Sequence, residues 1–188
     1  RLNRLITDVA NTSRLDAELA LQTTEPVDVR GIITSIVETF RGTLEDEDHR
    51  ILLEIQDVAP RSDAFVVNGH ESNLGRVITN LLDNAVKFSP EDSTIAVSCT
   101  RQPDGTTRLT VADEGPGIPG DKIKQLFRPF SQVDNRYDRN TAGTGLGLAL
   151  VRGLVALHDG KVWLENKPAG GLIAAIEFPG PSARAQAA

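Results

Sequence analysis

Residues 70–90 read HESNLGRVITNLLDNAVKFSP, and this segment predicts the central helix around which the chain is arranged. Its apolar residues recur at the spacing of one helix face, and they are Leu74, Val77, Ile78, Leu81, Leu82 and Ala85. Ser89-Pro90 ends the helix, because proline lacks an amide donor and disfavours a helical residue before it. The segment therefore predicts an amphipathic helix with one buried stripe.

Three polar side chains follow one edge of this predicted helix. At about 100° per residue, Asn80, Asn84 and Lys87 lie within about 60° of each other and roughly 120° from the centre of the apolar stripe. An amide carbonyl oxygen suits Mg²⁺, and an ammonium group suits a phosphate. The helix alone leaves a second interpretation open, in which these side chains are simply solvated.

The composition describes a globular domain. The 188 residues suffice for one domain with a sizeable core and an appendage, and 39% of them are hydrophobic. A net charge of −6 argues against a non-specific nucleic-acid surface, so we expect no nucleic-acid partner. Cys99 is the one cysteine, which excludes an internal disulfide, and its alternating apolar surroundings predict a buried thiol.

Both ends of the chain differ from its centre. Residues 1–24 have a narrow apolar seam, so we expect an amphipathic helix that packs on a partner helix. A terminal helix docked on its own domain is the alternative. Residues 25–29 are expected to be a linker, in which 27–29 could form a short strand, and 181–188 a disordered tail. The chain has no signal peptide, no run of about 20 apolar residues and no methionine, so we expect an internal fragment.

Residues 30–180 are expected to form the main domain. Helical periodicity predicts helices at 30–44, 70–89, 121–127 and 146–157. Alternating polarity predicts strands at 51–55, 65–67, 94–101, 106–112, 161–165 and 172–178, with a hairpin turn at Pro103-Asp104-Gly105. These elements predict an α/β (α+β) two-layer sandwich: a mixed, mostly antiparallel sheet covered on one face by three helices and preceded by a helical segment.

A long irregular segment, residues 113–144, opens with Asp113-Glu114-Gly115-Pro116-Gly117-Ile118-Pro119 directly after a strand. Irregular loops of this length inside a domain are uncommon and usually functional or mobile. A carboxylate at a strand end can accept a hydrogen bond from an exocyclic amine, and glycines let a flat ring approach the backbone. A glycine turn with a capping aspartate remains the alternative.

The same segment ends in Gly143-Thr144-Gly145-Leu146-Gly147-Leu148, which opens a helix. Backbone amides at a helix N-terminus form an anion site that the helix dipole strengthens. No Gly-Lys-Ser/Thr follows, and no strand precedes, so neither a Walker loop nor a dinucleotide fingerprint is present. A flexible glycine hinge remains the alternative.

Taken together, these motifs resemble the catalytic ATP-binding domain of sensor histidine kinases. Their order is Asn80…Asn84…Lys87, Asp113-x-Gly115-x-Gly117, Phe127…Phe130 and Gly143-x-Gly145-x-Gly147. That domain has the Bergerat (GHKL-type) fold, shared with gyrase and MutL. The resemblance covers about residues 30–180. Residues 1–18, which end in Ser13-Arg14-Leu15-Asp16-Ala17-Glu18, resemble the end of the second helix of the family's dimerisation and phosphotransfer hairpin, so residues 1–24 are expected to be the C-terminal part of that hairpin.

The resemblance implies ATP and Mg²⁺ as ligands and assigns roles to single residues. Asn84 would ligate Mg²⁺, and Asn80 and Lys87 would act at the phosphates. Asp113 would bind the adenine amine, with Gly115 and Gly117 lining the base. Phe127 and Phe130 would anchor a mobile lid, whose Arg136 and Arg139 could swing toward phosphate. The cofactor-binding helix start would comprise Thr144, Gly145, Leu146, Gly147 and Leu148.

The resemblance also distinguishes kinase from hydrolase. ATP-hydrolysing relatives carry a glutamate at the position of Asn80, where it activates water; an amide has no useful basicity. We therefore expect transfer of the γ-phosphoryl to a histidine outside this fragment, and from there to an aspartate of a response regulator. The alternatives are a degenerate, nucleotide-gated interaction module, an ATP hydrolase of the same fold, and an anti-sigma type serine kinase.

The implied partners are a second copy, joined through the N-terminal helix of the full-length protein, and a response regulator receiver domain. The fragment is expected to be cytoplasmic; an inner-membrane anchor in the full-length protein stays open.

Some residues depart from the family pattern. The phosphoacceptor histidine is absent: His70-Glu71 superficially matches its motif, but Gly75 stands where that motif has proline, and His70 fits a helix-capping role better. His49 and His158 are given no catalytic role. Asp159 replaces a usual glycine. Leu172 replaces a threonine whose hydroxyl helps hold the adenine region, so base affinity could be weaker, or a water could substitute.

Overall fold

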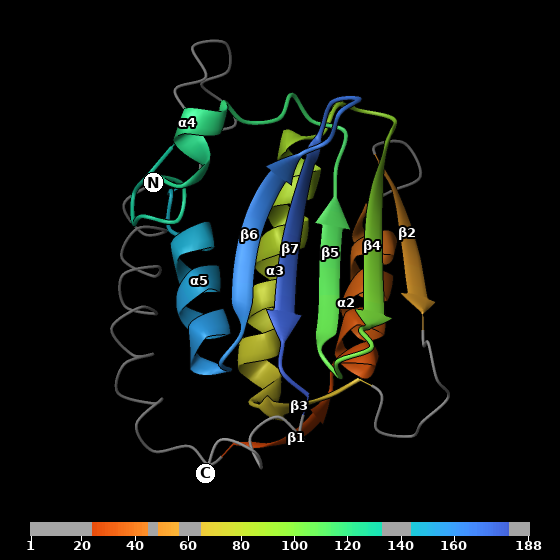
Figure 1. The fold of residues 1–188 in the computed structure, drawn as a ribbon. Helices are drawn as coiled ribbons and strands as arrows, with labels where there is room; N and C mark the ends of the chain where they lie inside the picture. Colours follow the sequence, from red (N-terminus) through yellow and green to blue (C-terminus); the bar gives the residue numbers. More distant parts are fainter. Residues whose placement is uncertain (1–23, 45–48, 57–64, 133–143, 181–188) are drawn as a thin grey trace.

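The computed structural model describes residues 24–44, 49–56, 65–132 and 144–180. These residues form a five-stranded sheet with helices on one face and a separate two-stranded sheet (Figure 1). In chain order the elements are β1 (Glu25–Asp28), α2 (Val29–Thr43), β2 (His49–Gln56), β3 (Val66–Gly69), α3 (Glu71–Phe88), β4 (Ser93–Arg101), β5 (Thr107–Ala112), α4 (Gly120–Ile123), α5 (Gly147–Leu157), β6 (Lys161–Asn166) and β7 (Leu172–Phe178).

The larger sheet has the strand order β2-β4-β5-β7-β6. β2 runs parallel to β4, and the other neighbouring pairs are antiparallel. Helices α2, α3 and α5 lie on one face of it. The predicted two-layer sandwich with a mixed, mostly antiparallel sheet is confirmed.

Helix α3 is the central helix that residues 70–90 predict. All six apolar residues of the predicted stripe are buried. The helix ends at Phe88. Its C-cap residue Ser89 has the extended ψ of 148° expected before Pro90 and donates its backbone N–H to the carbonyl of Ala85 (3.0 Å). His70 occupies the N-cap position, but its side chain makes no capping hydrogen bond. Its role at the helix start therefore belongs to its backbone carbonyl, which accepts from the N–H groups of Asn73 and Leu74.

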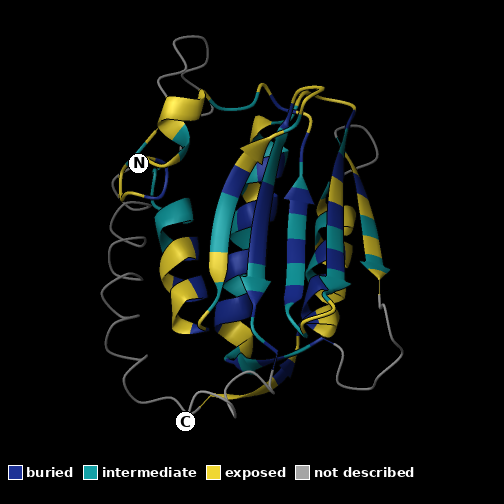
Figure 2. Ribbon diagram, viewed as in Figure 1, coloured by how far each residue is buried: buried dark blue, intermediate teal, exposed yellow. Residues whose placement is uncertain are grey.

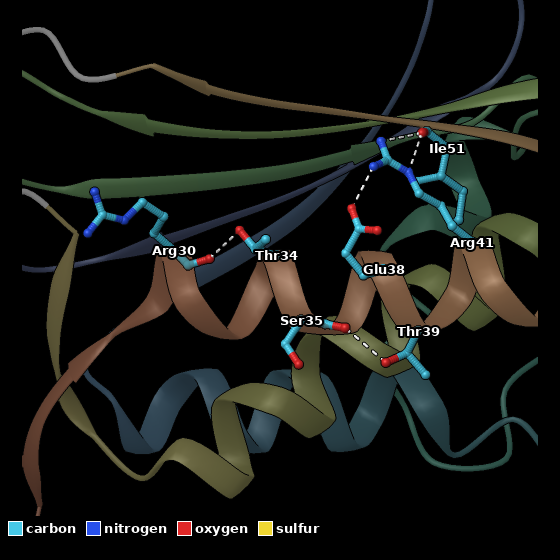
Figure 3. Close-up of polar contacts among 7 residues, drawn as sticks. All are labelled: Arg30, Thr34, Ser35, Glu38, Thr39, Arg41 and Ile51. Carbon is cyan, nitrogen blue, oxygen red and sulfur yellow. Dashed lines mark hydrogen bonds and ion pairs between the residues drawn. The ribbon is translucent and has the colours of Figure 1, made fainter.

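Helix α2 is attached to the edge strand β2 by one arginine (Figure 3). Arg41 donates to the carbonyl oxygen of Ile51 from Nε (3.1 Å) and Nη2 (2.8 Å), and its Nη1 pairs with Glu38 (2.8 Å). An edge strand exposes unpaired carbonyl groups that can recruit other strands. Arg41 satisfies one of these groups and holds the helix against the sheet.

The core lies between the sheet and the helices. Buried residues concentrate in the central strands and on one side of α3, while β2 is more exposed (Figure 2). Ile95, Val97 and Cys99 of β4 point into this core and alternate with more exposed neighbours. On the opposite face, Arg108 donates to Glu177 (Nε–Oε1 2.9 Å) and lies 5.7 Å from the ring centroid of Trp163. The polar character of that face explains the alternation seen in the sequence.

The hairpin between β4 and β5 turns where the sequence predicts. Gly105 adopts φ +87°, and Asp104 accepts a hydrogen bond from the backbone N–H of Thr106 (2.9 Å). This bond holds the pKa of the Asp104 carboxyl below its usual range. Gly105 therefore allows the backbone conformation of the turn, and the side chain of Asp104 stabilises it.

Two local predictions differ from the structure. β1 occupies Glu25–Asp28 within the segment expected to be a linker and pairs with β3. The helix expected at 121–127 is a single turn, α4, followed by tighter turns in which Gln125 and Arg128 each donate to the carbonyl three residues earlier. The predicted helix at 1–24, apart from Thr24, and the tail at 181–188 lie outside the described residues.

Candidate nucleotide-binding site

The start of α5 lies directly against the polar edge of α3. A methyl group added at Gly147 would lie 3.1 Å from Oδ1 of Asn80 and 3.9 Å from Nδ2 of Asn84. Asn80 donates through Nδ2 to the carbonyl of Arg76 (2.7 Å), which turns its Oδ1 toward Gly147. The structure thus brings together two motifs that are more than 60 residues apart in the sequence.

Asp113 closes the other end of the site. Only 7% of it is exposed, and its Oδ1 accepts backbone N–H groups from Gly115 (2.8 Å) and Leu172 (3.0 Å). Among the described residues, none donates a hydrogen bond to Oδ2. A nearly buried carboxylate held by one oxygen presents the other to a donor such as an exocyclic amine.

The glycines after Asp113 are required by close backbone contacts. A methyl group at Gly115 would lie 2.7 Å from the carbonyl oxygen of Phe88, at the end of α3. Gly117 has φ +71°, and a methyl group there would lie 2.8 Å from Oδ1 of Asn166. Glycine adopts this conformation without the steric cost that a side chain incurs. The loop therefore packs tightly between α3 and the end of β6.

The first turn of α5 has backbone N–H groups for which the described residues provide no hydrogen-bond acceptor. Leu146 is its N-cap residue, and the apolar side chain of Leu146 makes no capping hydrogen bond. The first N–H groups of a helix have no partner within it, so they can bind an anion. Gly145 precedes them with φ +72°, and a methyl group there would lie 2.8 Å from the backbone of Phe130 and of Ser131. Gly143 lies outside the described residues.

Comparison with known protein families identifies the family of this chain. The family described as "Histidine kinase-, DNA gyrase B-, and HSP90-like ATPase" matches residues 69–182, which include the α3 edge, the Asp113 loop and the α5 start. The chain belongs to this family. The resemblance inferred from the four motifs is thereby confirmed, and the chain is an ATP-binding domain of this histidine kinase-like family.

The relatives with detectable sequence similarity include sensor kinases. The chain is 34% identical to the sensor protein ChvG of Agrobacterium fabrum, across 88% of this chain and 28% of ChvG. It is 31% identical to the sensor-like histidine kinase SenX3 of Mycolicibacterium smegmatis, across 95% of this chain and 45% of SenX3. The chain therefore spans less than half the length of these relatives.

Solved structures agree with the fold. The mycobacterial sensor histidine kinase MprB is 33% identical and superposes with a TM-score of 0.67, covering 84% of this chain and 97% of that structure. Full-length ShkA in complex with AMPPNP is 28% identical with a TM-score of 0.77, covering 95% of this chain and 36% of ShkA. These structures share the sandwich described above.

The other predicted site residues of this histidine kinase-like domain differ in their burial and in their contacts. Phe127 is buried in the core, whereas Phe130 is 60% exposed and has φ +62°, so it approaches the α5 start through its backbone. The ammonium of Lys87 lies 4.8 Å from the ring centroid of Phe88. Thr144 and Leu148 are half-buried beside the helix start. Arg136 and Arg139 lie outside the described residues.

Sequence reasoning missed the turn between β6 and β7. Lys167 donates from Nζ to the carbonyl oxygen of Asp113 (3.0 Å), and Asn166 pairs with the backbone of Ile118. The sequence singled out Leu172 only because it lacks the hydroxyl of the usual threonine. In the structure, the backbone N–H of Leu172 donates a hydrogen bond to Oδ1 of Asp113. Contacts from side chain to backbone leave no periodic signal, so no pattern in the sequence could have identified Asn166 or Lys167.

The described residues offer few metal ligands. Within 24–44, 49–56, 65–132 and 144–180, no group of three or more histidine, cysteine or acidic side chains could hold a metal ion. A metal at the α3 edge would therefore meet amide oxygens. The same described part of the chain also contains no helix that is long and apolar enough to span a membrane.

Proposed function

We propose that this chain is the catalytic domain of a sensor histidine kinase, which transfers the γ-phosphoryl group of ATP to a histidine outside residues 1–188. A response regulator aspartate would receive the group next. The observation that carries the proposal is the close approach of Gly147 to Asn80 and Asn84, together with the Asp113 carboxylate, whose Oδ2 accepts no hydrogen bond from the described residues. This arrangement fits a ligand with an amine at one end and phosphates at the other.

ATP would lie along the line from Asp113 to α5. Its adenine amine would donate to Oδ2 of Asp113, and its base would lie on the loop of Gly115 and Gly117. Its phosphates would accept from the backbone N–H groups at the start of α5, which the helix dipole also favours. Lys87 would reach the phosphates by leaving the face of Phe88. The AMPPNP complex of the similar kinase ShkA supports a nucleotide in this fold.

The α3 edge also fits Mg²⁺. Asn84 would supply one amide oxygen, and phosphate oxygens and waters would complete the coordination, as is usual for this ion. The bound ion would neutralise charge that develops on the transferred group. Asn84 is half-buried and lies on the same edge of α3 as Asn80, facing the start of α5.

Asn80 favours phosphoryl transfer over hydrolysis. A general base must accept a proton from water, and an amide cannot do so at neutral pH. The Nδ2 of Asn80 is also committed to the carbonyl of Arg76. Catalysis would then rest on positioning and charge stabilisation, which suits transfer to a positioned histidine.

The histidines of the chain support an acceptor elsewhere. His158 is buried, with Nδ1 2.7 Å from the carbonyl of Leu154 and Nε2 accepting the backbone N–H of His70 (3.2 Å). His49 lies 3.3 Å from the hydroxyl of Ser93. His70 is placed next to Gly69 at the opposite end of α3 from Asn84. We therefore assign the acceptor histidine, the dimer contact and the receiver-domain partner to the full-length protein, with this domain in the cytoplasm.

Two experiments test the proposal. Calorimetry of the fragment with Mg²⁺ and ATP should show binding that Asn84→Ala weakens strongly, whereas Asn68→Ala, on β3, should bind normally. The full-length protein with labelled ATP should form an acid-labile phosphohistidine. ATP binding without phosphohistidine would favour an interaction module instead, and steady phosphate release by the fragment would favour a hydrolase.

A further inference from the structure

The last residue of β6, Asn166, and the turn that follows it hold the loop after Asp113. Asn166 accepts the backbone N–H of Ile118 through Oδ1 (2.8 Å) and donates from Nδ2 to the carbonyl oxygen of the same residue (2.7 Å). One side-chain amide therefore satisfies both backbone groups of Ile118, as a neighbouring strand would. The contact joins residues 48 positions apart.

The loop needs such a support. Gly115 and Gly117 permit the close approach of a base, but glycine has the greatest backbone freedom of any residue. Gly117 also has φ +71°. In an unsupported loop, a glycine would exchange this conformation with many others. Asn166 restricts this freedom at Ile118, directly after Gly117, and its Oδ1 would contact any side chain placed at Gly117.

The same turn also fixes the carboxylate end of the loop. Lys167 donates from Nζ to the carbonyl of Asp113, and the backbone N–H of Leu172 donates to its Oδ1. The turn is itself closed by the backbone N–H of Lys167, which donates to the carbonyl of Gly171 (3.0 Å). Asp113 and Ile118, at the two ends of the loop, are therefore both held by one short turn.

We propose that Asn166 is a positioning residue for the nucleotide base: its amide preforms the Gly117-Ile118 backbone so that the loop binds a purine without first being ordered. The inference rests on the proposed ATP-binding function. A preformed loop improves affinity because less conformational freedom is lost on binding. The α5 start binds phosphates independently of this loop, so the effect of Asn166 falls on the base.

Substitution of Asn166 distinguishes the contribution of the base to binding from that of the phosphates. Asn166→Ala removes the two hydrogen bonds that hold the Ile118 backbone, so ATP and ADP should bind about five- to tenfold more weakly. Binding of Mg²⁺-tripolyphosphate, which lacks a base, should not change. Asn166→Asp keeps the acceptor but sets a carboxylate against the Ile118 carbonyl, so it should weaken ATP at least as much as alanine does. Glu165→Gln, one residue earlier on β6, is the matched control and should bind ATP like the wild type.

Amide hydrogen exchange provides a readout that does not depend on ATP. The Ile118 amide should exchange faster in Asn166→Ala than in the wild type or in Glu165→Gln, with no change in melting temperature beyond that of the control. Unchanged ATP affinity in Asn166→Ala and Asn166→Asp, or equal weakening of ATP and tripolyphosphate, would overturn the positioning role. A wild-type domain that binds no ATP would instead contradict the proposed function itself.

Discussion

At the residue scale, Asp113 makes a sharp prediction about the base. Asp113→Asn keeps the shape of the side chain but replaces the free carboxylate oxygen with an amide that can itself donate. Two donors would then face each other, and ATP affinity should fall at least about 30-fold. Calorimetry measures this change, and Glu114→Gln, at the next position, should bind ATP normally. Wild-type affinity in Asp113→Asn would place the adenine amine elsewhere.

Gly171 and Gly170 form a matched pair in the β6–β7 turn. Both have φ near +95°. A methyl group at Gly171 would overlap the carbonyl oxygen of Asp113, whereas one at Gly170 would meet no atom of the described residues within 4 Å. Gly170→Ala should therefore lower the free energy of unfolding by about 1 kcal/mol through backbone strain alone. Gly171→Ala should lower it by about 3 kcal/mol or more. Urea denaturation compares the two, and equal losses would contradict the predicted clash.

Cys99 predicts a pH dependence. The thiol is fully buried, and burial, with a smaller contribution from the charge of Asp28, raises its pKa from 9.0 to about 12. In the unfolded chain the thiol ionises at its ordinary pKa, so its contribution to stability is complete below about pH 9 and is lost as the pH rises toward 12. Iodoacetamide at pH 8 should modify Cys99 only after denaturation; rapid modification of the native protein would contradict this burial.

At the element scale, α5 has one glycine that the site requires and one that it does not. Gly147 faces Asn80, so Gly147→Ala should weaken ATP binding about tenfold by pushing the phosphates and the α3 edge apart. Gly153 is exposed, and a methyl group added there would meet no atom of another described element within 4 Å. Gly153→Ala should leave ATP binding unchanged and stabilise the domain by about 0.5–1 kcal/mol. Thermal melting and calorimetry on both variants check this contrast.

At the scale of the whole molecule, the nucleotide should link the sheet side of the site to the helix side. Asp113 follows β5, Asn84 lies on α3, and α5 supplies the phosphate donors, so a ligand that contacts all three stabilises the folded state only. At 100 times its dissociation constant, Mg²⁺-ATP should add about 2.7 kcal/mol of stability. For a domain of this size that corresponds to a rise in melting temperature of roughly 5–10 °C.

Asp113→Asn provides the control for this linkage. Its melting temperature without ligand should stay near that of the wild type, because Asn can still accept from Gly115 and Leu172. Its melting temperature should then rise little with ATP at the concentration that stabilises the wild type. An equal rise in both proteins would mean that ATP stabilises the domain without its base being bound at Asp113.

The elements and the identity of the site could be read from local patterns. A helix buries one face, so its apolar residues recur about every turn, whereas the side chains of a strand alternate between its two faces. These periodicities predict the helix in residues 70–90 and the strands in residues 94–101 and 106–112. Asn84 and Asp113 carry polar side chains suited to a metal ion and an amine, and Gly147 leaves the helix-start amides uncovered, so a nucleotide site could be predicted at these three residues. The absence of a base at Asn80 was equally visible.

Other features depended on how the strands are ordered in space. The pairing of β7 with both β5 and β6 brings the turn at Asn166, Lys167 and Gly171 against the loop after Asp113. These contacts run from side chains to backbone atoms across 48 to 59 residues, and backbone atoms are the same in every residue. Local periodicity records which face of an element is buried, but it contains no information about which distant backbone a polar side chain meets.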